Sequence, residues 1–360
     1  MAEGFHLDLH MSERLSRGGH RVMSVFLGSI MVFGFLNNLL VLVLFCRFKT
    51  LRTPVNMLLL NISVSDMLVC VCGTTLSFAS SLRSRWLYGR GGCMWYGFAN
   101  SCFGIVSLIS LSVLSYDRYS TLMVCNRRTP NYRRPLLAVG GSWLYSVAWT
   151  VPPLLGWSSY GLEGAGTSCS VTWTVRSPAS HSYIICLFIF CLGLPVLVMV
   201  YCYGRLLYAV KQVGHIRRTA ARRREFHILF MVVTTVVCYL LCWMPYGVVA
   251  MMATFGRPGL ISPVASVIPS ILAKSSTVIN PVIYILMNKQ VRHTCCQVAD
   301  GNNVVDMTTL NRRACDESPI ATRPPKAKSC PADEEGNSGA DPDKDEPVEP
   351  VEPPVLPEIS

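Results

Sequence analysis

Seven long apolar segments divide the chain, and the short stretches between them hold most of its charged residues. The segments cover roughly residues 22–46, 55–78, 93–116, 136–157, 181–203, 226–255 and 263–287. Each is long enough for the about 20 residues that a helix needs to cross a bilayer. A backbone in lipid must satisfy its own hydrogen bonds, so we predict that each segment is a helix. The pattern indicates an all-α membrane protein with a seven-transmembrane helix bundle.

The composition agrees with this fold class. Hydrophobic residues make up 51% of the chain and charged residues 15%, whereas a soluble domain carries about 25% charged residues. A transmembrane barrel would show alternating segments of about ten residues, which the sequence lacks. We therefore predict an N-terminal segment (1–21), the bundle (22–287), a short amphipathic eighth helix (288–297) and a disordered, acidic, Pro-rich tail (298–360). The opening residues show no apolar core of a cleavable signal, so the first span is expected to direct insertion.

The net charge of +11 combines a basic body with an acidic tail. Lys and Arg concentrate in the loops after the first, third and fifth spans and just after the seventh. Basic loops of membrane proteins face the cytosol. We expect a multi-pass protein of the cell membrane whose N-terminus is extracellular and whose C-terminus is cytoplasmic. Because the basic residues flank membrane spans, they predict contact with lipid rather than with nucleic acid.

A single lysine, Lys274, lies near the middle of the last apolar segment. A charge at the centre of a bilayer costs about 2.5–3.5 kcal/mol on insertion scales and marks a functional site. A protonated amine there needs an acidic partner, which is Glu163 in the second outer loop or Asp66 in the second span; we favour Glu163. A buried lysine that loses its proton is a nucleophile able to form a Schiff base with an aldehyde. On the residues alone, a covalent ligand and a structural lysine paired with Asp66 both stay open.

Two cysteines, Cys93 at the start of the third span and Cys169 in the second outer loop, lie on the oxidising side of the membrane in this topology. We predict a disulfide between them. Such a bridge would fold the loop that carries Glu163 onto the bundle as a lid.

Polar residues inside the first two spans include Asn38, Asn61 and Asp66. Isolated polar groups in the membrane are costly, so these are expected to hydrogen-bond across helices or to bind an ion such as sodium. No other metal site is predicted.

The third span ends in Asp117-Arg118-Tyr119, which its length places at the cytosolic surface. Glu225, at the cytosolic start of the sixth span, could pair with Arg118, and outward movement of that helix would break the pair. Pro152, Pro153, Pro195, Pro245 and Pro281 lie inside apolar segments, where proline kinks a helix, and so predict hinges.

Trp243 and Tyr246 follow each other at a spacing of three in the sixth span, beside Pro245, and so share one face. They are either ordinary packing residues or the wall of a ligand pocket. After the seventh span, Cys295 and Cys296 follow a short basic run, which suits palmitoylation and membrane anchoring.

Several motifs together resemble a known family: Cys93 with Cys169, Asp117-Arg118-Tyr119, Cys242-Trp243-Met244-Pro245-Tyr246 and Asn280-Pro281-Val282-Ile283-Tyr284. Over roughly residues 22–297 the chain resembles the rhodopsin-like G-protein-coupled receptors. Lys274, seven residues before Pro281, resembles the retinal-attachment site of opsins. Longer stretches, such as residues 152–163, 221–225 and 286–290, resemble the non-visual encephalopsin and teleost multiple-tissue opsin group.

The resemblance implies a non-visual photoreceptor rather than an enzyme. Lys274 would carry 11-cis-retinal as a protonated Schiff base, in a pocket lined by Tyr96, Trp243 and Tyr246. Vertebrate visual opsins place a glutamate counterion where this chain has Tyr96, so the resemblance assigns that role to Glu163 and implies a bistable photoproduct.

The resemblance also implies a switch at the cytosolic side. Arg118 and Glu225 would lock the bundle with Asp117 and Tyr119 beside them, and Tyr203 and Tyr284 would swing in on opening, next to Asn280 and Pro281. The open bundle would bind a heterotrimeric G protein, and the tail would meet arrestin and a receptor kinase. The alternatives are a retinal photoisomerase, a receptor for a diffusible ligand, and an ion pump or channel.

Overall fold

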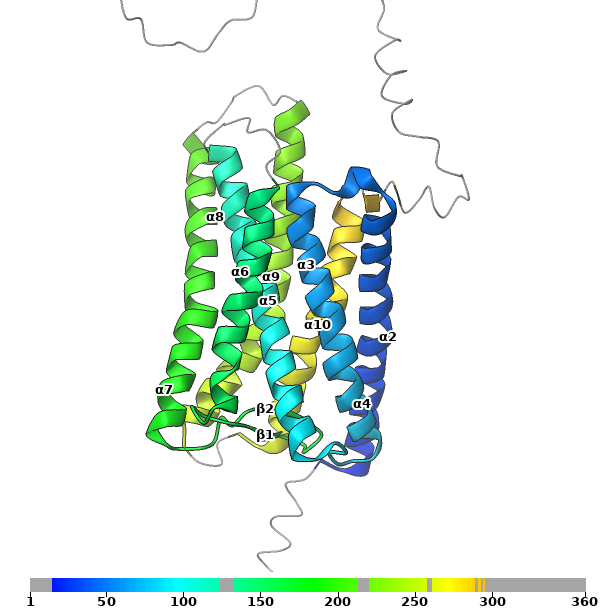
Figure 1. The fold of residues 1–360 in the computed structure, drawn as a ribbon, viewed down its shortest axis with the longest axis vertical. Coiled ribbons are helices and arrows are strands. Elements are labelled where there is room, and N and C mark those ends of the chain that lie inside the picture. Colours follow the sequence, from blue (N-terminus) through cyan, green and yellow to red (C-terminus); the bar gives the residue numbers. More distant parts are fainter. Residues whose placement is uncertain are drawn as a thin grey trace, which may run out of the picture. The chain divides into compact units, whose positions relative to one another are not determined.

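The computed structural model describes residues 15–123, 132–212, 220–257, 261–288, 291–292 and 294. These residues form a bundle of long helices with one β-hairpin at one end (Figure 1). The helical elements are α2 (Arg17–Arg47), α3 (Pro54–Val69), α4 (Thr75–Leu82), α5 (Gly89–Met123), α6 (Arg133–Thr150), α7 (Pro178–Cys186), α8 (Leu194–Gln212), α9 (Ala220–Phe255) and α10 (Pro263–Met287). All seven predicted spans are therefore helical, since α3 with α4 and α7 with α8 each form one span.

Two spans contain a π-helical turn that the apolar pattern did not predict. The turn η2 (Cys70–Thr74) joins α3 to α4, and η4 (Leu187–Gly193) joins α7 to α8. Such turns insert one extra residue into a helix and occur frequently at functional sites. Pro195 lies two residues after the end of η4, within the continuous helical span that α7, η4 and α8 form.

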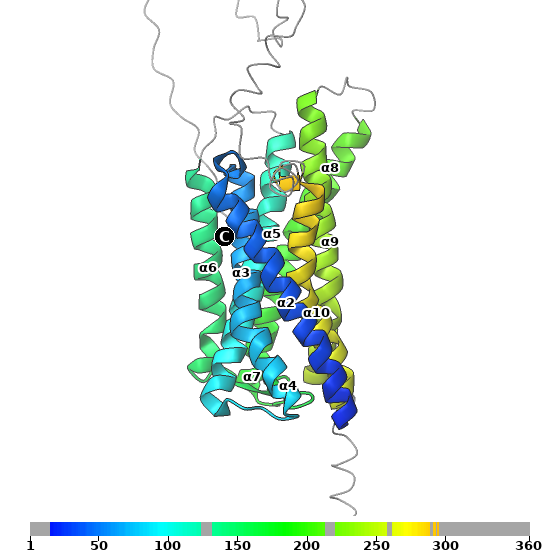
Figure 2. The ribbon, with the colours of Figure 1, turned by 90° about the vertical axis from the view of Figure 1, so that its right-hand side faces the viewer.

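Six of the described helical spans are long and apolar enough to cross a membrane, with one each in the ranges 17–47, 54–82, 89–123, 178–208, 226–255 and 265–287. The exception is α6, whose 18 residues begin with Arg133 and Arg134. The prediction that this helix continues to residue 157 is wrong. Pro152 and Pro153 do not kink it from within, because the α-helix ends at Thr150 and the 3₁₀ turn η3 (Pro152–Leu154) follows. The view turned by 90° shows α6 still running alongside the other spans (Figure 2).

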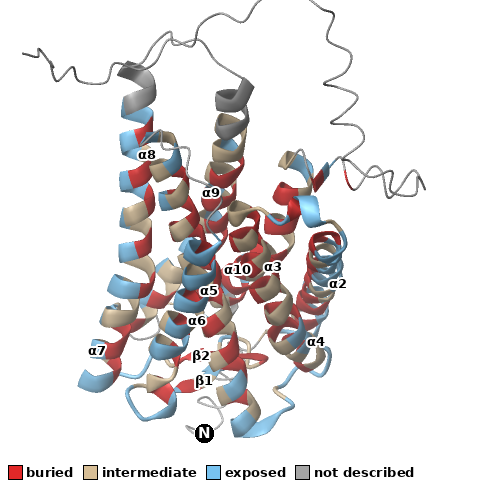
Figure 3. Cartoon of the chain, turned by 45° about the horizontal axis from the view of Figure 1, so that its top comes forward, coloured by how far each residue is buried: buried red, intermediate tan, exposed pale blue. Residues whose placement is uncertain are grey.

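The core lies between the helices, and the outward faces are apolar as well. Ile62, Leu111 and Val232 are fully buried in the central cluster, while Leu137 and Leu144 on α6 are each 74% exposed. Figure 3 shows buried positions on the inner faces of the helices and exposed ones outside. A helix that is apolar on its exposed face suits lipid rather than water.

The hairpin consists of β1 (Tyr160–Glu163) and β2 (Ser168–Val171), paired antiparallel with Glu163 opposite Ser168. Gly164 and Gly166 in the connecting turn have φ values of 50° and 72°, a region that favours glycine. Cys169 of β2 is bonded to Cys93 of α5, with 5.5 Å between the Cα atoms. The predicted disulfide is confirmed, and it holds the hairpin against the bundle. We call this end of the bundle the hairpin end.

Little of the predicted eighth helix is described. Residues 291, 292 and 294 are helical, and Val291 is buried in a cluster with Val41, Leu44, Phe45 and Leu51. Cys295, Cys296 and the tail lie outside the described residues.

Candidate functional site

A cavity of about 180 Å³ lies inside the bundle next to the hairpin. It is bounded by α3, α5, η4, α9 and α10, and the hairpin closes it. Its lining includes Tyr96, Gly104, Glu163, Phe188, Trp243, Tyr246 and Lys274. The structure thus brings the predicted pocket residues from four separate parts of the chain into one site.

Lys274 reaches this cavity from the middle of α10. Its Nζ lies 5.6 Å from the centroid of the Tyr96 ring, close enough for a cation–π attraction. Among the described residues, no carboxylate oxygen lies within 4.0 Å of this amine. The ion pair found in that part of the chain joins Arg118 to Asp117 instead. The ammonium therefore has a polarisable ring nearby and no direct acidic contact.

Glu163, the last residue of β1, lines the same cavity. Burial raises the pKa of this carboxyl above its ordinary value, while the positive charge of Lys274 and polar contacts with Tyr246, Ser170 and Trp173 favour its charged form. Burial outweighs the other effects. A nearby cation of fixed charge would shift the balance toward the carboxylate.

Tyr96 lies on α5, one turn after the disulfide, and is 1% exposed. Its hydroxyl hydrogen-bonds the hydroxyl of Ser77 on α4. The Trp86 ring meets it edge-on, with 5.4 Å between the centroids. These contacts hold the ring in place beside Lys274.

The aromatic wall of the cavity comes from α9. The Trp243 indole N–H donates to the Ser276 hydroxyl on α10 at 3.2 Å, and its ring stacks on Tyr239 at 5.7 Å. Tyr246 meets the Trp243 ring edge-on at 6.3 Å. Its hydroxyl accepts a hydrogen bond from the Trp173 indole at 3.3 Å. The wall therefore touches α10 on one side and the loop after β2 on the other.

Gly104 explains how the wall reaches α5. A Cβ atom at this position would lie 2.9 Å from Cη2 of Trp243, so any larger residue would push the indole away. The Tyr239 hydroxyl donates to the backbone carbonyl of Gly104 at 2.9 Å. Glycine here allows Trp243 to pack directly on the α5 backbone.

A polar network extends deeper into the bundle from Asp66, which also lines the cavity. The Asn280 amide donates to Asp66 at 2.9 Å and the Ser107 hydroxyl donates to the same carboxylate at 3.1 Å. Asn38 joins α2 to α10 by donating to the carbonyl of Thr277 at 2.8 Å. The residues hydrogen-bond across helices, as expected, although Asn38 reaches the α10 backbone rather than Asp66. No cluster of His, Cys, Asp and Glu able to hold a metal ion occurs within the described ranges.

Asn61 belongs to a second set of contacts between helices. Its amide N–H groups donate to the hydroxyls of Ser110 on α5 and Ser142 on α6, at 2.8 and 3.2 Å. Its carbonyl accepts from the Trp143 indole at 2.8 Å. These bonds account for the structural role of this asparagine.

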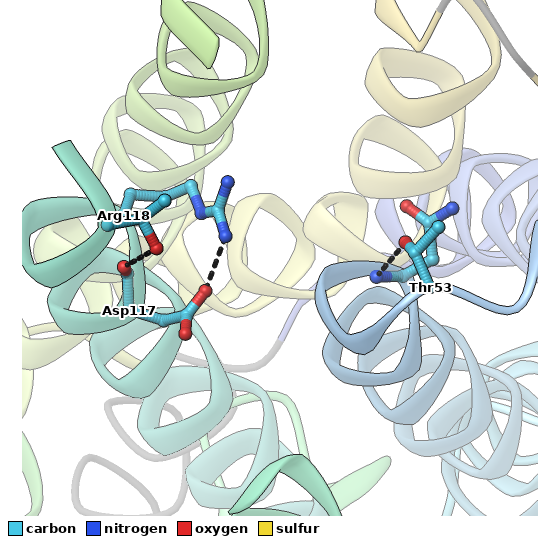
Figure 4. A network of polar contacts seen from close by, with 5 residues as sticks. Thr53, Asp117 and Arg118 are labelled. Carbon is cyan, nitrogen blue, oxygen red and sulfur yellow. Dashed lines mark hydrogen bonds and ion pairs between the residues drawn. The ribbon is translucent and has the colours of Figure 1, made fainter. Parts of the chain in front are cut away.

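Arg118 lies near the end of α5 opposite the hairpin, as helix length predicted, and its side chain is buried. Its side chain is bent onto Asp117, with 2.6 Å between Nη2 and Oδ2 (Figure 4). In the same view Thr53 caps α3 by accepting from the Asn56 backbone N–H. The α5 helix continues to Met123, so Arg118 lies inside the helix, before its last turn. The side chain of Glu225 lies outside the described residues, and the predicted contact with Arg118 stays a prediction.

The aromatic residues of this region differ in their contacts. Tyr203 shares a hydrogen bond of 2.8 Å with the Ser115 hydroxyl, and Tyr119 meets Tyr201 edge-on at 6.0 Å. Tyr284 is buried, and its hydroxyl has no hydrogen-bond partner in the described part of the chain. Pro281 and Pro245 both lie inside their helices, as predicted.

Three cavity residues were missed by the reasoning from sequence: Gly104, Asn100 and Trp173. Asn100 was visible as an amide in an uncharged apolar segment. Trp173 was visible as an aromatic residue four positions after Cys169 in a loop expected to act as a lid. Gly104 carried no signal, because its role depends on Trp243 of another helix.

Comparison with known proteins decides the family. The family model of the 7 transmembrane receptor (rhodopsin family) matches residues 37–284. The chain belongs to the rhodopsin family of seven-transmembrane receptors. Within that family its relatives are opsins, including Opsin-3 of Mus musculus, 39% identical over 77% of this chain and 70% of the mouse protein. Parapinopsin of Ictalurus punctatus is 36% identical over 80% of this chain and 84% of the catfish protein.

The solved structures agree with this assignment. The crystal structure of squid rhodopsin superposes with a TM-score of 0.73, at 27% identity, over 86% of this chain and 94% of that chain.

A further relative by sequence, Melanopsin of Felis catus, is 35% identical, and the alignment spans 58% of its length. Assignment to the encephalopsin group stays a prediction.

The receptor is thus an opsin-type, light-activated G-protein-coupled receptor and a multi-pass membrane protein. Its family implies a retinal chromophore and coupling to a G protein. The cavity suits such a ligand, because it is mostly apolar and aromatic and its lining includes one amine, Lys274, and two carboxyl groups, Asp66 and Glu163.

Proposed function

We propose that this receptor is a non-visual photoreceptor in which Lys274 holds 11-cis-retinal through a protonated Schiff base. The observation that carries the proposal is the position of Lys274: an amine inside an aromatic cavity, with no carboxylate within 4.0 Å in the described part of the chain. A lysine amine in its neutral form is a nucleophile that condenses with an aldehyde, with loss of water. When bound, retinal supplies the absorption of light and a change of shape.

Glu163 balances the positive charge of the linkage. It faces the cavity from the hairpin, and α5 offers Tyr96 rather than an acid near Lys274. Asp66, the other candidate acid, is already engaged by Asn280 and Ser107. The raised pKa of Glu163 reflects burial that a cation at Lys274 would offset. A counterion on the hairpin favours a bistable photoproduct, and loss of the visible band to hydroxylamine after illumination would contradict that.

Trp243 links the cavity to the movement of α9. It contacts α5 at Gly104 and α10 at Ser276, two residues after Lys274. A changed ligand shape at this ring would disturb both contacts, and Pro245 provides the hinge about which α9 tilts. The resting state is disfavoured and the open state becomes populated.

The opposite end of the bundle then opens to the G protein. Arg118 leaves its contacts with Asp117 and Glu225, beside Tyr119. Tyr203 leaves Ser115 and, with Tyr284, moves into the opened space next to Asn280 and Pro281. The buried Tyr284 hydroxyl, which has no partner among the described residues, is free to take one in the open state.

The hairpin end faces the outside of the cell in this scheme, because its disulfide forms in an oxidising compartment. The N-terminus is then extracellular and the C-terminus cytoplasmic. Cys295 and Cys296 are palmitoylated and anchor the eighth helix in lipid. The acidic tail, from about residue 298, serves arrestin and a receptor kinase.

Light-dependent nucleotide exchange on a purified heterotrimeric G protein tests the proposal. The wild type reconstituted with 11-cis-retinal should accelerate exchange on illumination. Lys274→Ala, which leaves the rest of the cavity intact, should show no response to light. A light response that survives this substitution would refute the attachment.

A further inference from the structure

His227 is a polar side chain of α9 that the scheme above does not use. It lies toward the end of α9 opposite the hairpin (Figure 1) and is half-buried. Its Nε2 atom is 2.7 Å from the backbone carbonyl oxygen of Met287, the last residue of α10. A carbonyl oxygen can only accept, so Nε2 carries the hydrogen and donates it. This bond joins the ends of two neighbouring helices.

The carbonyl of Met287 is one of the last in α10, and such carbonyls need a donor from outside their helix. In a continued helix it would accept from the backbone N–H of Val291. The chain instead turns extended at Asn288, with φ −81° and ψ 105°, and the Val291 N–H donates to the Asn288 side-chain oxygen at 3.3 Å. The imidazole of His227 takes the place of that N–H, at a helix end whose partial negative charge favours a donor.

The end of α10 is itself held against a third helix. The side-chain amide of Asn288 donates to the side-chain oxygen of Asn56 on α3 at 3.3 Å. The Asn56 amide donates in turn to the backbone carbonyl of Leu51 at 2.7 Å, and Met287 packs against the central cluster. The acceptor of the His227 bond therefore lies on a part of the bundle that does not depend on α9 for its position.

Tilting of α9 about Pro245 breaks this bond early in the movement. About 27 Å of helix separates His227 from Pro245, at about 1.5 Å per residue. A tilt of about 10° at the proline would move the imidazole by about 5 Å. A hydrogen bond does not survive a displacement of that size.

We infer that the bond from His227 to Met287 is a latch that holds α9 in the resting state and is released when α9 tilts. The inference rests on the proposed movement of α9. A contact that exists only in the resting state shifts the equilibrium between the two states by its own free energy. Loss of one hydrogen bond should raise the population of the open state about three- to tenfold. The latch joins α9 to α10, and so acts apart from the predicted pairing of Arg118 with Glu225.

Nucleotide exchange on the G protein tests the latch. His227→Phe keeps a ring and removes the N–H group, and it should raise exchange in the dark about three- to tenfold. Exchange under saturating light should stay at the wild-type rate, because the latch is already open there. His227→Gln keeps an N–H group at the position of Nε2 and should stay close to the wild type in the dark. His227→Leu provides the same test should the phenylalanine variant not fold.

The matched control is Thr234→Ala, on the same helix. The Thr234 hydroxyl donates to the Phe230 carbonyl at 2.9 Å, within α9 itself. Its removal takes a polar group from α9 without touching another helix, so dark nucleotide exchange should not change.

Amide hydrogen exchange at the end of α10 measures the latch without a G protein. The Asn288 backbone N–H donates to the Tyr284 carbonyl at 2.9 Å, in the last turn that His227 caps. In the dark this amide should exchange about three- to tenfold faster in His227→Phe than in the wild type, and His227→Gln and Thr234→Ala should match the wild type. Illumination should produce the same rise in the wild type and add little in His227→Phe.

The outcomes separate this inference from the proposed function. If His227→Phe matches the wild type in dark nucleotide exchange and in amide exchange, the latch is refuted, whatever the response to light. Equal effects of His227→Phe and His227→Gln also overturn it, because the donor would then not matter. A loss of light-driven exchange with unchanged dark exchange would assign His227 to contact with the G protein instead. If the wild type shows no light-driven exchange, the proposed function fails, and faster amide exchange in His227→Phe would still support the latch.

Discussion

Replacing Glu163 by glutamine should lower the pKa of the protonated linkage at Lys274 by about two to three units. The substitution keeps the shape of the side chain and removes its charge. The separation of Nζ and the carboxylate exceeds 4.0 Å, because no ion pair joins them. At an effective dielectric constant of about 20, two unit charges attract by about 4 kcal/mol at 4 Å and by about 2.4 kcal/mol at about 7 Å. One pKa unit corresponds to about 1.4 kcal/mol, which gives the expected shift.

Titration of the visible band in the dark measures this shift. Protonated and deprotonated linkages absorb at well separated wavelengths, so the midpoint is the pKa. Glu163→Asp retains the charge and should titrate much closer to the wild type. Asp66→Asn removes the other buried carboxylate that the sequence offered as a partner, and its midpoint should match the wild type.

A midpoint of Glu163→Gln within half a unit of the wild type would refute the assignment of Glu163. A large shift in Asp66→Asn instead would identify Asp66 as the partner of Lys274. That result would mean that the hydrogen bonds from Asn280 and Ser107 do not commit Asp66 to the deeper network.

Three other predictions concern the ligand-free protein and the packing of its helices. Burial raises the pKa of Glu163 above its ordinary value of 4.5, so the folded state holds this proton more tightly than the unfolded state. Stability should therefore fall as pH rises from 4.5 through the raised pKa. In Glu163→Gln, the melting temperature of the ligand-free protein should change less with pH over that range. Gly104→Ala places a methyl group 2.9 Å from Trp243 and should raise dark nucleotide exchange on the G protein, whereas unchanged dark exchange would show that the indole does not report the resting state. Ile62→Ala, at a fully buried position, should cost about 2–5 kcal/mol and lower the melting temperature in detergent, while Leu144→Ala on the exposed face of α6 should not; equal effects would contradict the packing described here.

The features that were correctly predicted from sequence depend on the length of the apolar segments or on how few lysines and acids those segments and loops contain. Seven apolar segments had to be helices, and the structure places the one lysine within them in the cavity. Few acids were available to it, which directed attention to Glu163, and the structure places that residue in the same cavity. Each inference needed only the order of residues along one chain.

The features that sequence reasoning missed depend on contacts between helices. Each π-helical turn adds one residue to its helix and so shifts which side chains share a face. In a uniformly hydrophobic segment this shift leaves no visible pattern. Helix length predicted the position of Arg118 near the end of its span but not that its side chain is buried. Gly73 and Asn100 lie on different helices, and their relation appears only when the two backbones approach.

The absorption spectra of the wild type and of Lys274→Ala after reconstitution with 11-cis-retinal show whether Lys274 holds the chromophore. We expect a visible band in the wild type that is absent from the variant, while both proteins melt at similar temperatures without ligand. A visible band of wild-type intensity in Lys274→Ala would contradict it.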